Sequence, residues 1–170
     1  DIRLIHISTD CVFSGKKGSY KETDLSDAED VYGKTKYLGE ISEENAITIR
    51  TSIIGRELTT TNNLVEWFLS NHGKKVNGFT NAIFSGFPTI CLANIIDGII
   101  TGEQKLNGIY HIASQPISKF KLLTLIRDKM KLNIDIEEYS DYYCDRSLDS
   151  SLYQDKTGFK PDSWEEMIDK

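Results

Sequence analysis

The sequence has little of what marks several common protein classes. Its three cysteines, Cys11, Cys91 and Cys144, are far apart and odd in number, so they form neither a disulfide framework nor a metal-site spacing. Reduced thiols in a cytoplasmic protein are the simplest interpretation. No apolar run approaches the roughly 20 residues that a membrane-spanning helix needs, and the first residues do not read as a signal peptide.

A cluster of positive charge is also missing. The 170 residues carry a net charge of −6, and no run of Lys or Arg forms a basic stripe. We therefore expect neither nucleic acid nor a membrane surface as a partner. A hydrophobic content of 39% and a charged content of 27% are typical of a folded globular chain.

The third absence concerns phosphate binding. Neither G-x-G-x-x-G nor G-x-x-x-x-G-K-[ST] occurs anywhere in the sequence. A glycine loop for a dinucleotide would have to precede residue 1, and a doubly wound sheet normally has earlier strands as well. We expect the chain to be the C-terminal portion of a longer protein whose glycine-rich part is absent here.

What is present alternates between strand and helix patterns. "RLIHIS" and "AITIRTSIIG" are short apolar runs that suit buried parallel strands, and residues 32–44 between them show a helical pattern. This order predicts a βαβ unit. Further helices are expected after Asn62 or Asn63, over 89–100 and after Ser118, with strands over 108–114 and 133–139 and short helices in the tail. The alternation predicts an α/β fold.

"DVYGKTKYLGE" places Tyr32 and Lys36 one helical turn apart. A cation one turn away favours the phenolate form, so the pair could act as general acid or base on a carbonyl or an alcohol. Taken alone, such a pair is more often solvated helix surface. The residues Ser8-Thr9-Asp10 end a buried strand some two dozen residues earlier, where ligands bind in open α/β sheets, although the same residues could simply close a turn.

The ordered motifs resemble the extended short-chain dehydrogenase/reductase superfamily, and within it the dTDP-4-dehydrorhamnose reductase family. That family carries S-T-D-Y-V-F-x-G, then Y-x-E, then V-Y-G-x-[ST]-K-x-x-G-E, which "STDCVFSG", "YKE" and "VYGKTKYLGE" match. The similarity continues through "IRTSIIG", "FSGFPT", "GIYHIAS" and "DRSLDSSLY". It implies the C-terminal part of a Rossmann-like doubly wound parallel sheet plus a small α/β substrate-binding domain. Residues 1–60 and parts of 88–115 would form the Rossmann-like portion, and residues 61–87 and 116–170 mainly the substrate-binding portion.

The resemblance also implies chemistry. NADH or NADPH would reduce the 4-keto group of a nucleotide-linked deoxysugar for cell-surface polysaccharide synthesis, in the cytoplasm, with no metal and with a homodimer as one option. This chain alone would be inactive. Tyr32 would be the general acid, Lys36 would hold the nicotinamide ribose and make the tyrosine more acidic, and Thr9 would orient the carbonyl. The implied cofactor contacts are Ser8, Tyr32, Lys36, Arg50, Thr51 and Ser52. The implied substrate contacts are Thr9, Asp10, Cys11, Val12, Phe13, Ile53, Asn81, Phe84 and Arg146.

Two positions depart from the family pattern. Cys11 stands where the family usually has Tyr, and Ile53 where it usually has an aromatic residue, so a different sugar is expected to be acceptable. Two alternatives stay open. One is an epimerase or dehydratase of the same superfamily, and the other is a non-catalytic nucleotide-sugar-binding module.

Overall fold

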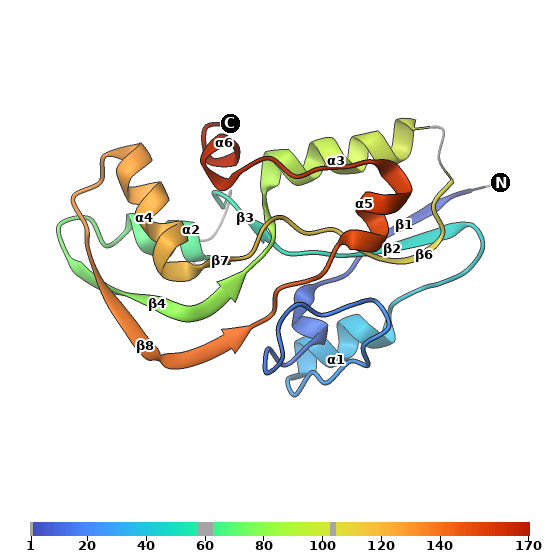
Figure 1. Ribbon diagram of the computed structural model, residues 1–170, viewed down its shortest axis with the longest axis horizontal. Coiled ribbons are helices and arrows are strands. Elements are labelled where there is room, and N and C mark those ends of the chain that lie inside the picture. The colour runs from blue at the N-terminus through green and yellow to red at the C-terminus, as the bar shows by residue number, and fades with distance from the viewer. Residues whose placement is uncertain (1, 58–62, 103–104) are drawn as a thin grey trace.

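The computed structural model describes residues 2–57, 63–102 and 105–170 (Figure 1). Its central sheet contains three parallel strands in the order β1 (Leu4–Ile7), β2 (Ala46–Arg50) and β6 (Gly108–His111). Every residue of β2 is buried, as expected for a middle strand covered on both faces. In Figure 1, α1 (Val31–Leu38) and α3 (Thr89–Thr101) lie on opposite sides of these strands.

Short elements follow the carboxyl ends of the strands. A 3₁₀ turn, η1 (Asp10–Val12), comes directly after β1. Past β2 the chain enters β3 (Ile53–Ile54), which pairs in parallel with β5 (Phe87–Pro88) just before α3. The carboxyl ends of β1 and β2 are joined there, because the Asp10 amide donates to the Thr51 carbonyl oxygen at 3.1 Å.

A second sheet lies at the other end of the molecule. Its order is β7 (Ile117–Ser118), β4 (Lys75–Phe84) and β8 (Asp135–Asp145), and β4 runs parallel to β8. Helix α4 (Lys119–Met130) packs on β4. The remaining helices are α2 (Leu64–Leu69), α5 (Ser151–Thr157) and α6 (Trp164–Ile168).

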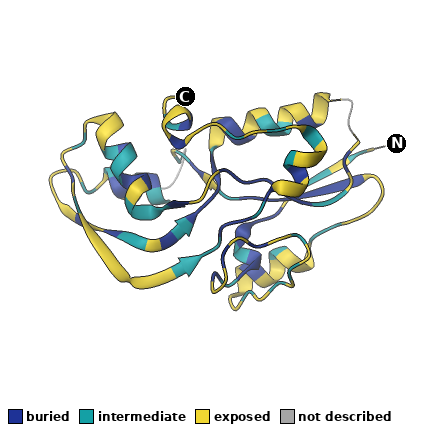
Figure 2. Cartoon of the chain, viewed as in Figure 1, coloured by how far each residue is buried: buried dark blue, intermediate teal, exposed yellow. Residues whose placement is uncertain are grey.

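One buried cluster connects the two sheets. It contains Ile49 of β2, Phe84 of β4, Leu122 of α4 and Met167 of α6. A smaller cluster, centred on Val12, Phe13 and Tyr20, lies under the loop before α1. Figure 2 shows the buried central strands and the exposed outer stretches of β8 and α1.

The predicted elements are largely confirmed. The βαβ unit is present, and the side chains of Asn63 and Ser118 cap α2 and α4. Asn62 lies outside the described residues. The helix expected over 32–44 ends at Leu38, because Gly39 caps it and Glu40 turns toward the interior. Strand β8 continues to Asp145, beyond the strand expected over 133–139. The division into 1–60 with parts of 88–115, and 61–87 with 116–170, stays a prediction.

Two further observations apply to the described residues only. Among them, no helix is long and apolar enough to cross a membrane. In the same part of the chain, no group of three or more His, Cys, Asp or Glu side chains is placed to hold a metal ion.

Candidate active site

The predicted Tyr/Lys pair lies on α1 beside the end of β1. Asp30 caps the helix, since its carboxylate accepts from the Gly33 amide at 2.7 Å. Tyr32, in the first turn, is 57% exposed. The Lys36 Nζ donates to the Ile7 carbonyl oxygen at 2.6 Å. The lysine is therefore fixed at the carboxyl end of a parallel strand, where ligands bind in open α/β sheets.

Gly33 allows α1 to approach η1 closely. A Cβ atom at position 33 would lie 2.2 Å from the Cys11 carbonyl oxygen and 2.7 Å from the Ala28 Cβ. The first of these neighbours is backbone, so it cannot move aside as a flexible side chain would. The glycine between the predicted catalytic residues thus sets how near Tyr32 and Lys36 come to the Ser8-Thr9-Asp10 turn.

The hydroxyls of that turn are both engaged. The Thr9 Oγ1 accepts from the Cys11 amide at 3.2 Å, which caps η1, and donates to Asp10 Oδ1 at 3.2 Å. The Ser8 hydroxyl donates to Glu40 Oε1 at 2.7 Å. Burial raises the pKa of Asp10 despite the hydrogen bonds around it. The turn-closing alternative is therefore what the structure displays, and Thr9 keeps its place next to η1.

Arg50, expected at the cofactor, is instead inside the protein. Its guanidinium donates twice to Glu40, at 2.8 and 2.7 Å, and lies 5.2 Å from the centre of the Phe13 ring. It also lies 3.2 Å from Nε2 of His111, whose Nδ1 is 2.9 Å from the Tyr20 carbonyl oxygen. A carbonyl only accepts, so Nδ1 carries the ring proton and Nε2 accepts from Arg50. Arg50 is 2% exposed and is not presented to a ligand.

The neighbouring positions 51 and 52 lie at the strand end as predicted. Thr51 is 3% exposed, and its hydroxyl has no hydrogen-bond partner among the described residues. Such a buried orphan hydroxyl is unusual and fits a group waiting for a ligand oxygen or nitrogen. The Ser52 carbonyl oxygen accepts from the Phe87 amide at 2.9 Å.

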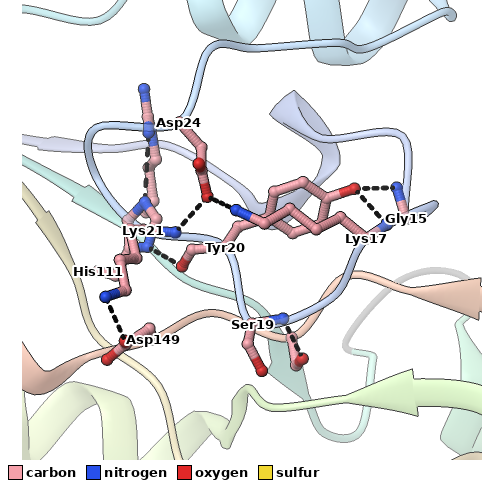
Figure 3. A network of polar contacts seen from close by, with 10 residues as sticks. Gly15, Lys17, Ser19, Tyr20, Lys21, Asp24, His111 and Asp149 are labelled. Atoms are coloured by element: carbon pink, nitrogen blue, oxygen red, sulfur yellow. Dashed lines mark hydrogen bonds and ion pairs between the residues drawn. The ribbon is translucent and has the colours of Figure 1, made fainter.

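The long loop before α1 is organised around Tyr20 (Figure 3). Its hydroxyl accepts from the amides of Gly15 and Lys17 at 3.2 and 3.1 Å, and its ring stacks on Phe13 at 4.2 Å. Glu22 then accepts from the His111 amide at 2.8 Å. The Y-K-E stretch therefore holds the loop against β6.

Arg146, at the end of β8, reaches the same region from the second sheet. Its NH1 donates to the Cys11 sulfur at 3.2 Å, and its Nε is buried without a partner among the described residues. Burial opposes the charge of Arg146, but interactions with Cys11, then Cys144, Asp10 and Asp30, outweigh it and raise the pKa of Arg146. Burial, followed by the charge of Asp10, raises the pKa of the Cys11 thiol, which argues against a nucleophilic cysteine.

Some predicted substrate contacts are not brought to the site. Val12 and Phe13 are fully buried in the small cluster, and Phe84 is 8% exposed and packs against Trp164. Their side chains form part of the core, and the substrate contacts that the resemblance implies for them stay a prediction. Ile53 is exposed, and the Asn81 amide donates to the Ser140 carbonyl oxygen on β8.

A cavity of about 520 Å³ lies elsewhere, against α3, α5 and α6. None of the predicted site residues lines it. We therefore do not place the reaction there.

Sequence reasoning also missed contributors. Asp30, Gly33 and Glu40 received no role, although each lies within the same eleven-residue motif. The cap position of Asp30 and the four-residue spacing from Lys36 to Glu40 could have drawn attention to them.

Comparison with known proteins places this geometry in a family. The model of the RmlD substrate binding domain matches residues 1–170. A dTDP-4-dehydrorhamnose reductase of Aggregatibacter actinomycetemcomitans is 30% identical over 97% of this chain and 64% of its own length. The spore coat polysaccharide biosynthesis protein SpsK of Bacillus subtilis (strain 168) is 30% identical over 98% of this chain and 62% of its own length. The chain thus spans somewhat less than two thirds of these relatives.

Known structures agree. A hypothetical dTDP-4-dehydrorhamnose reductase from Sulfolobus tokodaii is 31% identical, with a TM-score of 0.78 over 95% of this chain and 62% of that one. A dTDP-4-dehydrorhamnose reductase from Bacillus anthracis, crystallised with NADP, has a TM-score of 0.83 over 98% of this chain and 64% of that one. At 22% identity, the second likeness shows a shared fold. The Rossmann-like α/β class predicted from the sequence is confirmed.

Proposed function

This chain belongs to the family of the RmlD substrate binding domain, and from that premise we propose that it supplies the proton-donating and sugar-binding part of a nucleotide-sugar 4-keto reductase. The observation that carries the proposal is the placement of Lys36. Its ammonium is fixed on the Ile7 carbonyl at the carboxyl end of β1, one helical turn from the exposed Tyr32. If this face of α1 were only solvated surface, neither the close approach at Gly33 nor the anchoring of Lys36 would be required.

The residues fit the nicotinamide end of a dinucleotide. Lys36 offers a cation, and Thr51 offers a buried hydroxyl without a partner in the described chain. Lys36 would hold the ribose, with Ser8, Thr51 and Ser52 close to the same strand ends. When bound, NADH or NADPH supplies the hydride, and the relative from Bacillus anthracis was crystallised with NADP.

The protein's own share of the reaction is a proton transfer. Tyr32 would give the proton of its hydroxyl to the C4 carbonyl oxygen as the carbonyl becomes an alcohol, and the adjacent cation of Lys36 favours that loss. Thr9 would turn its O–H from Asp10 to the same oxygen. Two hydrogen-bond donors aimed at the developing negative charge would stabilise the transition state.

The nucleotide would be held from the second sheet. Arg146 has a buried Nε that lacks a hydrogen-bond partner among the described residues, and its guanidinium suits the geometry of a phosphate. The guanidinium of Arg56, by contrast, forms an ion pair with Glu66. We therefore place a diphosphate at Arg146, with Asp10, Cys11, Ile53 and Asn81 as further candidates for contact with the sugar nucleotide.

The test is Tyr32→Phe in the natural protein that contains this chain. Cofactor oxidation with a panel of dTDP- and UDP-linked 4-keto-sugars should fall by at least about a hundredfold, the usual contribution of a general acid, while dinucleotide affinity changes little. Absorbance at the nicotinamide band gives the rate, and cofactor fluorescence gives the affinity. Tyr37→Phe, on the same helix and 39% exposed, is the matched control and should keep its activity. Undiminished turnover by Tyr32→Phe would refute the assigned role. Epimerised or dehydrated products would instead support the sister activities.

A further inference from the structure

A buried ion pair ties the end of α1 to strand β2. The side chains of Glu40 and Arg50 are 4% and 2% exposed, and they make two parallel hydrogen bonds. Every other ion pair between described residues has at least one partner whose side chain is about half exposed or more. Burying two charges costs solvation that their attraction only partly returns, so stability alone is a weak reason for this pair.

Both oxygens of the Glu40 carboxylate accept hydrogen bonds. Besides the two bonds from Arg50, it accepts one from the Ser8 hydroxyl at 2.7 Å. Ser8 directly follows Ile7, whose carbonyl oxygen accepts from Lys36. Lys36 and Glu40, four residues apart, therefore contact consecutive residues at the end of β1.

These contacts bring opposite charges close together. Glu40 lies two residues past the end of α1, and without Arg50 its carboxylate would attract the Lys36 ammonium, which contacts the residue next to Ser8. No ion pair joins Lys36 to Glu40 in the described chain, and Arg50 holds the carboxylate instead. The charge of Lys36 thereby stays available at the strand end, next to Tyr32.

Arg50 is itself immobilised, so the arrangement is rigid. His111 accepts from its NH1 group, and the Phe13 ring faces its guanidinium. The loop around Tyr20 fixes His111 in turn. Nothing in this shell lets Arg50 release Glu40 without breaking several buried hydrogen bonds.

We propose that Glu40 and Arg50 are positioning residues for Lys36: Arg50 occupies the carboxylate that would otherwise capture the lysine. This inference rests on the proposed function, because it assigns Lys36 to the reaction. Neither residue needs to touch cofactor or substrate.

The experiment compares two variants of the natural protein. In Arg50→Met the Glu40 carboxylate loses its partner and should draw Lys36 away from the Ile7 carbonyl. A displacement of this kind should lower kcat by roughly a hundredfold, the loss that a misplacement of about 1 Å can cause. In the double variant Glu40→Gln/Arg50→Met no carboxylate remains to capture Lys36. Its kcat should return to within about tenfold of wild type, because replacing both members of a buried pair is far milder than removing one.

A second readout follows Lys36 without turnover. Acylation by acetyl N-hydroxysuccinimide ester, quantified by mass spectrometry, is compared with acylation of Lys34, an exposed lysine of the same helix. Relative to Lys34, Lys36 should react several-fold more slowly in Arg50→Met than in the double variant. Glu44→Gln, an exposed site just past the helix, is the control and should match wild type in both readouts.

The outcomes separate the possibilities. Equal kcat and equal Lys36 labelling in the single and double variants would overturn the inference, and so would a folded double variant that stays a hundredfold impaired with unchanged labelling. If Arg50→Met fails to fold, the double variant is compared with wild type alone. A kcat within about tenfold of wild type supports the inference, and a kcat that stays a hundredfold lower with unchanged Lys36 labelling overturns it. A wild-type protein that reduces none of the 4-keto-sugars would refute the proposed function, while the labelling comparison would still decide the positioning role.

Discussion

At the scale of single residues, the site depends on side chains whose orientation and protonation state are fixed by their hydrogen-bonding partners. His111 is the clearest case, since it is fully buried between the Arg50 guanidinium and the Tyr20 carbonyl. Burial, and then the positive charge of Arg50, lowers the pKa of His111 to about 4. A neutral ring with its proton on Nδ1 is the form that fits both neighbours.

This protonation state predicts a pH dependence of stability. The pKa of His111 is about 4 in the folded protein and near 6.5 in the unfolded chain, so folding favours the neutral ring. Its contribution is complete above pH ~6.5 and is lost as the pH falls toward about 4, a total of about 3 kcal/mol. His111→Gln removes the titrating group. Between pH 6.5 and 4.5 its free energy of unfolding should therefore fall less steeply than that of wild type, by up to ~1.4 kcal/mol per pH unit.

Urea unfolding of the natural protein at a series of pH values measures this difference. The exposed His72→Gln variant is the matched control and should follow the wild-type curve. Parallel curves for wild type and His111→Gln would show that the imidazole is not held neutral by the fold.

At the scale of the element, α1 is positioned by contacts at both ends. Gly33 touches the Cys11 backbone near its start, and Glu40 is bound to Ser8 and Arg50 just past its end. Tyr32 and Lys36 belong to the segment that these contacts hold. An amphipathic pattern alone would not specify such a placement.

Gly33→Ala should therefore disturb the site through the helix. The new Cβ would lie 2.2 Å from the Cys11 carbonyl oxygen, so α1 must shift away from η1, at a cost of about 1–3 kcal/mol. The matched control is Gly39→Ala, whose Cβ would come no closer than 3.5 Å to any neighbour. Melting temperature and kcat should both fall for Gly33→Ala and hold for Gly39→Ala. Wild-type kcat in a folded Gly33→Ala protein would contradict a tight α1–η1 contact.

How far the sequence predicts these features depends on the range of the interactions. Local patterns were sufficient for the βαβ unit, the caps at Asn63 and Ser118, and the Tyr32–Lys36 pair. The early end of α1 was missed because the burial of Glu40 depends on Arg50, ten residues away on β2. The sequence also could not show that the rings of Phe13 and Phe84 pack against Tyr20 and Trp164, because these contacts come from the tertiary fold.

At the scale of the whole molecule, the two sheets meet in one apolar core. Buried side chains of β2, β4, α4 and α6 belong to a single cluster. Arg146, the residue after β8, also donates a hydrogen bond to Cys11 of η1. The region that would hold the sugar nucleotide is thus connected, through packed side chains, to the region that carries Tyr32.

Phe84→Ala tests this continuity. The ring is 8% exposed and packs on Trp164, so its removal should cost about 3–5 kcal/mol through lost burial and a cavity. Because both sheets share the core, hydrogen exchange followed by mass spectrometry should show β2 and β4 losing protection together. Ile53→Ala, at a side chain that is 56% exposed, is the control and should change protection little. Loss of protection confined to β4 and β8 would show instead that the second sheet opens independently. A raised KM for the sugar nucleotide at unchanged stability would return Phe84 to the binding surface first expected for it.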